Sequence, residues 1–280
     1  MSTFASDFVD EFDARWDEVS ILIRMAEELG EENEEYSVLC RAAIVLIVAN
    51  LEGFIQETIK CLIADVNSNN AFSITSEKMK RTFCGQFIDI ERGNEKKITK
   101  LVELFEHLNV RYTVEPFFYE NNKNPKASVI DKYFEEIGGK NFWGYITDCD
   151  IEKVFENDSD IIRNLLDTLR NVLVLGVEDF PYNIVLSSLG YNLSGAKVSD
   201  ECLWKVFLNQ TLKARHDVAH GVSQDNTMSL DEIKSTKDKV KILELTFAIL
   251  VFKNGINDRF RAGKCNEQLH LSNLKELMQI

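Results

Sequence analysis

The feature that most constrains the fold is a long and unusually apolar helical segment, from about Tyr36 to Val66. Its middle holds the uninterrupted run AAIVLIVA, residues 42–49, and apolar side chains fall on most faces of a helix with 3.6 residues per turn. A helix that is apolar all round has to be buried, so we expect this one at the centre of its domain. The run has 8 residues, whereas a membrane-spanning helix needs about 20. We therefore expect a core helix and no membrane segment.

The segment before it has the pattern of an amphipathic helix. Between residues 3 and 29, apolar residues recur three or four positions apart, and Gly30 stands where a C-terminal cap is expected. The acidic connector EENEE that follows is short. These two helices are therefore predicted to form an antiparallel hairpin.

Helical pattern returns near the C-terminus. One helix is predicted to open at Ser199 or Asp200 and to stop at Gly221. Ser229, with Glu232 three residues later, has the spacing of a capping box and predicts the start of a final long helix. Two helices from each end of the chain would together form a four-helix core.

The middle third is less regular. Helices are predicted at about Glu95–Leu108, at about Ala127–Ile137 and from Ser159 to Leu175, and the aromatic, turn-rich stretches between them leave room for a few short strands. The expected fold class is all-α. We expect a single domain over residues 1–280, with core helices in about 1–66 and 199–262, a mostly helical insertion at about 67–198 and a C-terminal tail at 263–280.

Composition narrows the class of protein. The six cysteines contain no CxxC pair, which argues against a zinc ribbon or a thioredoxin-type redox site. The N-terminus, MSTFASDFVDEFD, is acidic from the start and lacks the basic and apolar regions of a signal peptide. We expect a soluble protein of a reducing compartment, located in the cytoplasm.

Charge is spread unevenly along the chain. The net charge is −14, yet residues 1–66 hold 15 acids against 4 bases, and residues 201–280 hold 10 acids against 12 bases. Only this last segment could tolerate a polyanion, which the N-terminal third would repel.

The last segment contains KARHDVAHG, residues 213–221, with two of the four histidines of the chain. In the simplest interpretation, these are polar residues near a helix end, where basic groups complement the helix dipole. A second interpretation is a metallohydrolase, because His216 and His220 are four residues apart and HDVAH is one methylene away from the zinc-protease pattern HExxH. That site would need Asp217 in place of the glutamate, and only Glu232 or Glu244 could complete the ligand set.

A third interpretation starts from Arg215 and His220. Arginine offers a fixed fork of donors suited to phosphate, and histidine transfers protons near neutral pH. Cleavage of RNA without a metal ion needs both functions, one to activate the ribose 2′-hydroxyl and one to stabilise the charge that grows on the phosphate. A separation of five residues places the two side chains about 140° apart on an ideal helix. They would converge only if the helix unwinds near Gly221 or if a second subunit supplies half of the site.

The motif that starts at Arg215 resembles a known signature. RHDVAH matches the RxxxxH pattern of the HEPN superfamily, and RHDVAHG is similar to the RNxxAHG form of its MAE-like, RiboL-PSP-type families. The run LIVANLEGFIQETI in the second helix also resembles the early helix of that group. The resemblance covers roughly residues 1–66 and 199–262.

This resemblance implies a metal-independent endoribonuclease without cofactors, whose site forms where two subunits meet. By position, Arg215 would bind the scissile phosphate, His220 would transfer the proton and His216 would assist. We expect supporting roles for Asp217 and Glu52, and weak RNA contacts for Lys213 and Lys205. Such proteins often act as toxins or in defence against phage, sometimes restrained by an antitoxin or another defence-system protein.

The expected partners are therefore an RNA substrate and a second copy of the chain, with no DNA and no membrane. The strong negative charge argues against general RNA binding and favours a specific substrate enclosed by a dimer. The rival hypothesis is a non-catalytic module that keeps the helical fold and binds a protein or a nucleotide.

Overall fold

The computed structural model describes residues 2–88, 94–118, 124–186, 191, 198–221 and 228–260. Within these residues the fold is all-α, as expected, and the short strands considered for the middle third do not form. The one β interaction there is an isolated antiparallel bridge between Thr75 and Ile256. The elements are α1 (Phe4–Asp10), η1 (Ala14–Trp16), α2 (Asp17–Leu29), α3 (Glu34–Ser68), η2 (Phe72–Ile74), α4 (Glu77–Gly85), α5 (Glu95–Leu108), η3 (Glu115–Phe117), α6 (Ala127–Ile137), α7 (Phe142–Ile146), η4 (Asp150–Glu156), α8 (Ser159–Val177), α9 (Leu203–Ala219) and α10 (Leu230–Gly255).

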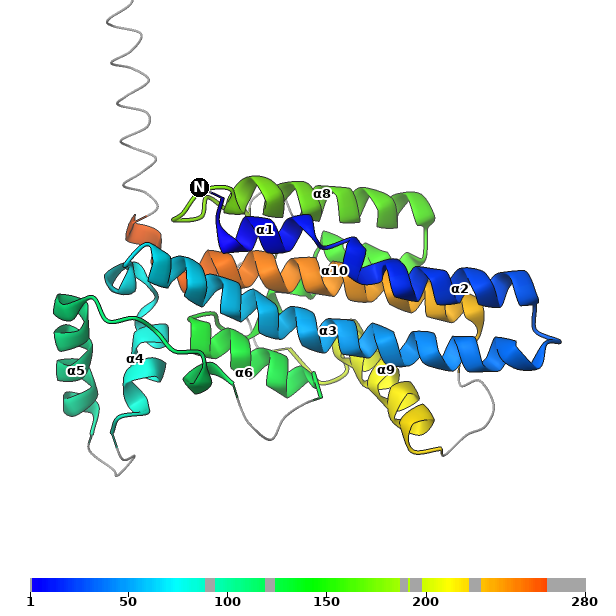
Figure 1. The fold of residues 1–280 in the computed structure, drawn as a ribbon, viewed down its shortest axis with the longest axis horizontal. Helices are drawn as coiled ribbons and strands as arrows, with labels where there is room; N and C mark the ends of the chain where they lie inside the picture. The colour runs from blue at the N-terminus through cyan, green and yellow to red at the C-terminus, as the bar shows by residue number, and fades with distance from the viewer. Residues whose placement is uncertain are drawn as a thin grey trace, which may run out of the picture.

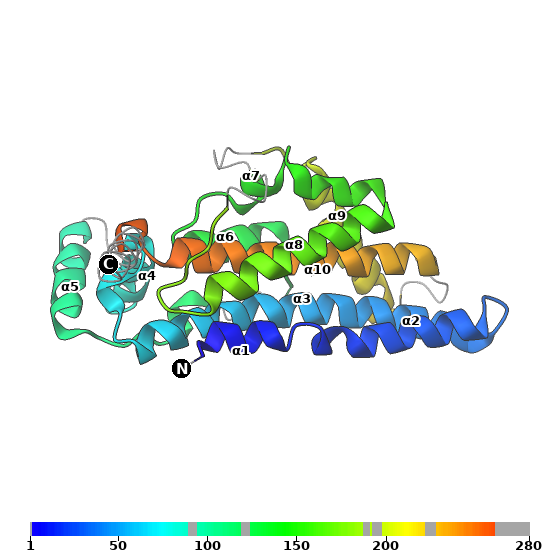
Figure 2. The same ribbon diagram turned by 90° about the horizontal axis from the view of Figure 1, so that it is seen from above.

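The apolar helix α3 lies at the centre, as the sequence predicts. It packs against α1, α2, α9 and α10, and it runs nearly the length of the bundle (Figures 1 and 2). By length and composition alone α3 would also pass for a membrane-spanning helix. Here its apolar residues, from Ile44 through Leu51 to Leu62, form the core of the bundle.

The first helical segment is broken in two, which differs from the single helix expected between residues 3 and 29. α1 ends at Asp10, a short 3-10 turn follows, and α2 begins at Asp17. Three acids, Asp10, Glu11 and Asp13, lie at this break. These acids are unfavourable at the C-terminal end of α1, whereas Asp17 and Glu18 in the first turn of α2 complement its dipole and favour a new helix start there.

The predicted end of α2 and the predicted start of α10 are present, whereas the expected start of α9 at Ser199 or Asp200 is wrong: α9 begins at Leu203 after the N-cap residue Cys202, which makes no side-chain capping bond. Gly30 ends α2 with a φ of 74°, and the Asn33 side chain accepts from the backbone N–H of Glu35 to cap α3. Ser229 and Glu232 form the expected reciprocal capping box at the start of α10. Short polar signals in the sequence therefore fix where these long helices begin and end.

One helix of the predicted insertion belongs to the central bundle. α8 packs along α10 and also contacts α1 (Figure 2). Its apolar residues Leu169, Leu173 and Val177 are buried. The middle third is therefore not only an insertion outside a four-helix core, because its helix α8 covers one side of α10.

The buried Asp65 fastens the N-terminus to this bundle. Its carboxylate accepts the backbone N–H groups of Phe4 and Ala5, at 2.8 and 3.0 Å, and the hydroxyl of Tyr182 at 2.7 Å. The three donors come from α1 and from the chain beyond α8. One carboxylate thus satisfies free N–H groups at the start of a helix and ties distant segments together.

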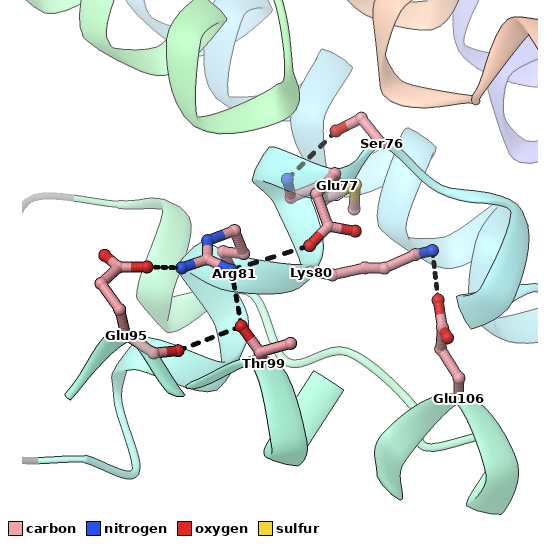
Figure 3. Close-up of polar contacts among 8 residues, drawn as sticks. Ser76, Glu77, Lys80, Arg81, Glu95, Thr99 and Glu106 are labelled. Carbon is pink, nitrogen blue, oxygen red and sulfur yellow. Dashed lines mark hydrogen bonds and ion pairs between the residues drawn. The ribbon is translucent and has the colours of Figure 1, made fainter. Parts of the chain in front are cut away.

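A hairpin of α4 and α5 projects from one end of the bundle (Figure 1). Figure 3 shows its polar contacts: Lys80 pairs with Glu106, and Arg81 pairs with Glu95 and Glu77. Lys80 also donates to the carbonyl of Ser73 at 2.8 Å, which satisfies a nearly buried ammonium group. These contacts give Lys80, Arg81 and their three acidic partners a structural role.

Glu244, in the middle of α10, is buried in the core. One of its carboxylate oxygens accepts the Trp16 indole N–H at 3.1 Å, and the other has no hydrogen-bond partner within the described residues. Burial raises the pKa of Glu244 well above its ordinary value. Because the folded state then holds a proton that the unfolded state releases, stability should fall as pH rises from the ordinary Glu pKa through the raised one.

We expect Glu244→Gln to remove this decline and to leave the protein at least as stable at neutral pH. Each unit of pKa shift corresponds to about 1.4 kcal/mol of unfolding free energy. Urea unfolding across a pH series measures the effect, with Glu57→Gln, an exposed acid paired with Lys60, as the control. Identical pH profiles for the wild type and Glu244→Gln would show that Glu244 is not the titrating group.

Candidate active site at the end of α9

The helix α9 places the motif outside the bundle. It packs against α3, α6 and α7, and its buried residues are Trp204, Phe207, Leu208, Thr211 and Ala214. This buried stripe ends just before the motif, and Figure 1 shows the C-terminal part of α9 running away from α3. His216 and His220 are therefore exposed, while Arg215 and Asp217 are half-buried.

The C-terminal turn of α9 explains the glycine of the motif. The helix ends at Ala219, and the backbone N–H of His220 still donates to the carbonyl of His216 at 3.0 Å. Gly221 then has a φ of 63°, a left-handed conformation that non-glycine residues rarely adopt. A Cβ on Gly221 would meet nothing within 4 Å. Glycine is required here by the backbone conformation and not by crowding.

The two histidines lie together, on the same face of the helix. Their ring centroids are 4.2 Å apart, with the planes tilted by 47°. Within the described part of the chain, neither imidazole has a hydrogen bond or an ion pair. Two adjacent, solvent-facing rings can both reach a ligand that approaches this end of α9.

Arg215 is also uncommitted: its guanidinium has no hydrogen bond or ion pair with any described residue. It lies at the edge of the buried stripe, one turn after Thr211. Because α9 stays helical through Ala219, the angle between Arg215 and His220 remains about 140° around the helix axis. The helix does not unwind early enough to bring them together within one subunit.

The other residues expected to support the site are spread more widely. Asp217 and Lys213 line a groove beside the motif. Lys205 is at the opposite end of α9, where it pairs with Asp200 at 3.0 Å. Glu52 lines a separate, small hollow with Pro125 and Tyr133 at the start of α6, and no residue of the motif lines that hollow.

The two acids considered as third metal ligands are committed elsewhere. Glu232 belongs to the capping box of α10, and Glu244 is buried against Trp16. Among the described residues, no three His, Cys, Asp or Glu side chains are grouped as a metal site would require. The donor set around HDVAH therefore does not fit the zinc-protease arrangement.

A groove of about 890 Å³ runs between α9, the start of α8 and the first half of α10. Its size is within the range of small-molecule sites. The wall from α9 includes Thr211, Lys213 and Asp217, and the wall from α10 includes Ser235, Asp238 and Lys239. Sequence patterns do not indicate this groove, because it depends on how α8, α9 and α10 are arranged in space.

Polar contacts fix one end of the groove. Asn157, in a left-handed conformation after η4, accepts from Ser235 at 2.8 Å and from Lys239 at 2.9 Å. The ammonium of Lys239 lies over the rings of Phe155 and Phe207, and burial lowers its pKa. These contacts commit Lys239 to the wall of the groove.

The sequence of the chain also matches a known family. The sequence matches the family model described as RiboL-PSP-HEPN over residues 10–250. The chain belongs to the RiboL-PSP-HEPN family. The match runs through the middle third, which the sequence resemblance had left outside, and this agrees with the packing of α8 in the bundle. Comparison with curated proteins and with solved structures found no match. Membership in the HEPN superfamily indicates a ribonuclease-type or nucleotide-binding function.

Proposed function

We propose that this RiboL-PSP-HEPN protein is an endoribonuclease that cleaves RNA by attack of a ribose 2′-hydroxyl on the neighbouring phosphate, without a metal ion. The observation that carries this proposal is the uncommitted state of Arg215 and His220 at the projecting end of α9. Arg215, His216 and His220 form no hydrogen bond or ion pair within the described residues, and the two imidazoles are in ring contact, so all three groups are available to one ligand at this helix end. A free guanidinium and two free imidazoles at one helix end have the chemistry that this reaction needs.

Each residue has a distinct role in this proposal. His220 accepts the proton of the 2′-hydroxyl or donates one to the leaving oxygen, and Arg215 stabilises the negative charge on the phosphate in the transition state. His216, in ring contact with His220, assists in the proton transfer. Lys213 lies on the same side of α9 and attracts the RNA backbone.

The active unit that we propose is a two-fold dimer with the ends of both α9 helices facing each other. Within one subunit, Arg215 and His220 diverge, whereas phosphate binding and proton transfer have to converge on one RNA backbone. A two-fold axis near Gly221 would bring Arg215 of one copy toward His220 of the other. It would also concentrate positive potential in a protein with a net charge of −14.

Mixing two inactive variants tests the shared site. Arg215→Ala and His220→Ala proteins are combined under conditions of subunit exchange and assayed on RNA in the presence of EDTA. Half of the dimers are then mixed, and each mixed dimer has one intact site of two. We expect recovery of about a quarter of the wild-type activity for a two-fold interface.

The control omits exchange, because the same two proteins mixed without it should stay inactive. Light scattering at the assay concentration reports the dimer independently. Activity that stays at the level of the separate variants after complete exchange would place Arg215 and His220 of one site in the same subunit. A monomeric active species would have the same consequence.

In the cell, we propose that such a nuclease acts as a toxin or as an anti-phage effector, held in check by a partner protein. The non-catalytic alternative is a module that binds a small ligand in the groove beside α9, whose volume is within the range of small-molecule sites. If the protein binds a nucleotide or a protein partner but cleaves no RNA, this alternative is favoured.

A further inference from the structure

The groove borders the C-terminal half of α9, next to the turn that carries His220, and His220 itself does not line it. Asp217 lines it and precedes His220 by three residues, so the two side chains are neighbours on the helix surface, about 4.5 Å apart along the axis. Lys213, one turn before Asp217, lines the same wall. A nucleotide chain whose phosphate lies at His220 would therefore have an adjacent base at the mouth of the groove.

Most of the charged groups in the groove already have partners. Lys239 donates to Asn157 and Ser235, and Lys234 pairs with Glu27 and Asp231. Glu232 accepts from Ser229 in the capping box. These contacts hold the walls and leave few groups to recognise a ligand.

Two carboxylates remain uncommitted. Within the described residues, neither Asp217 nor Asp238 makes a hydrogen bond or an ion pair, although both line the groove. Burial raises the pKa of Asp238, even though Lys237, Lys239 and Lys241 lie near enough to lower it. Burying a carboxylate without a hydrogen-bond donor costs free energy. A ligand that brings N–H groups to this carboxylate would recover that free energy.

The charge of the lining argues against a nucleoside polyphosphate. Four acids, Asp217, Asp231, Glu232 and Asp238, outnumber the three lysines at positions 213, 234 and 239. Two of those lysines are occupied by protein partners. The free groups therefore match the N–H edge of a base much better than a chain of phosphates.

We propose that this groove binds the base of the nucleotide next to the scissile phosphate, and that Asp238, together with Asp217, selects guanine. Single-stranded RNA is read through the Watson–Crick edges of unstacked bases. Guanine presents two adjacent N–H donors on this edge, which a carboxylate can accept with its two oxygens. Uracil presents one N–H between two carbonyl oxygens, and these would face the negative carboxylates.

This inference rests on the proposed ribonuclease, and a cleavage map tests it. An RNA with every dinucleotide is digested, and the rates at each position are compared for the wild type, Asp238→Asn and Asp160→Asn. We expect the wild type to cleave preferentially beside guanine. Asp238→Asn should reduce this preference by roughly 10-fold, because one well-formed bidentate contact to a base discriminates at about that level.

Asp160→Asn is the control for the loss of one negative charge. Asp160 lies on α8 outside the groove and pairs with Arg163, so Asp160→Asn removes the same charge without touching the groove. Asn has the shape of Asp, and Asp238 makes no hydrogen bond or ion pair within the described residues, so Asp238→Asn should fold, although it loses the attraction of Lys237, Lys239 and Lys241. If the wild type cleaves RNA and Asp238→Asn gives the same cleavage rates at every position, the groove does not recognise the base. The proposed ribonuclease activity would be unaffected by that result.

A binding measurement separates the two proposals. Guanosine and uridine have no phosphate and cannot be cleaved, so calorimetric titration of each into the wild type reports the groove alone. Tighter binding of guanosine, weakened by Asp238→Asn, would support the groove even if no RNA were cleaved. Equal binding of the two nucleosides, or GTP binding far more tightly than guanosine, would overturn the inference.

Discussion

Alanine in place of His220 or of Arg215 is expected to lower the rate of RNA cleavage by about 10²-fold or more. Loss of a proton-transfer group and loss of a donor to a developing negative charge each have effects of that size. Both variants should remain folded, because His220 is exposed, Arg215 is only half-buried, and neither forms a hydrogen bond or an ion pair within the described residues. Initial rates on one RNA substrate, at matched protein concentrations, measure the change.

Matched controls distinguish a local effect from a general one. His107 is an exposed histidine on α5, in the hairpin at one end of the bundle, and Arg163 is an exposed arginine on α8. His107→Ala and Arg163→Ala should cleave at the wild-type rate. Normal cleavage by His220→Ala or Arg215→Ala would show that the site is wrongly assigned. A larger loss in His216→Ala than in His220→Ala would exchange the roles of the two histidines.

Local signals in the sequence were enough to locate several helices. α5 and α6 have the predicted bounds, Glu95–Leu108 and Ala127–Ile137. The capping box of α10 and the glycine after α2 were visible because such ends depend on a few neighbouring residues. The apolar spacing continues through the break between α1 and α2, so the sequence pattern does not reveal this break.

Tertiary packing was harder to predict. The pattern of α8 is that of any amphipathic helix, and nothing in it says that its apolar face covers α10. The separation of Glu52 from the motif likewise depends on where along α3 the helix α9 crosses. Periodicity gives the face of a helix that is buried, but not the helix that buries it.

Only part of the candidate site can be predicted from the sequence, because only part of it is formed by residues close together in the chain. Arg215, His216 and His220 are within six residues, so their arrangement around α9 follows from helix geometry. The groove needs Asp238 on α10 and Ile162 on α8 beside Asp217 on α9, and these residues are brought together only by the fold. The predicted tail, residues 263–280, lies outside the described residues.

Blocking the ribose 2′-hydroxyl next to the cleaved bond of the RNA is expected to abolish cleavage of that bond. An RNA oligonucleotide is first mapped to find its cleaved bond, and the nucleotide on the 5′ side of that bond is then replaced by its 2′-O-methyl form. If the 2′-hydroxyl is the nucleophile, the bond should become uncleavable, because the attacking oxygen is blocked while the phosphate and the base are unchanged. The matched substrate has the same substitution one nucleotide away and should be cut normally.

The chemical ends of the fragments, produced by purified protein in EDTA, test the central claim most directly. Mass spectrometry distinguishes a 2′,3′-cyclic phosphate on one fragment and a 5′-hydroxyl on the other from the products of water attack. Our account predicts cyclic phosphate and 5′-hydroxyl ends, formed at the same rate with and without the chelator and lost in His220→Ala. Fragments with 5′-phosphate and 3′-hydroxyl ends, or cleavage abolished by EDTA and restored by added metal, would contradict it.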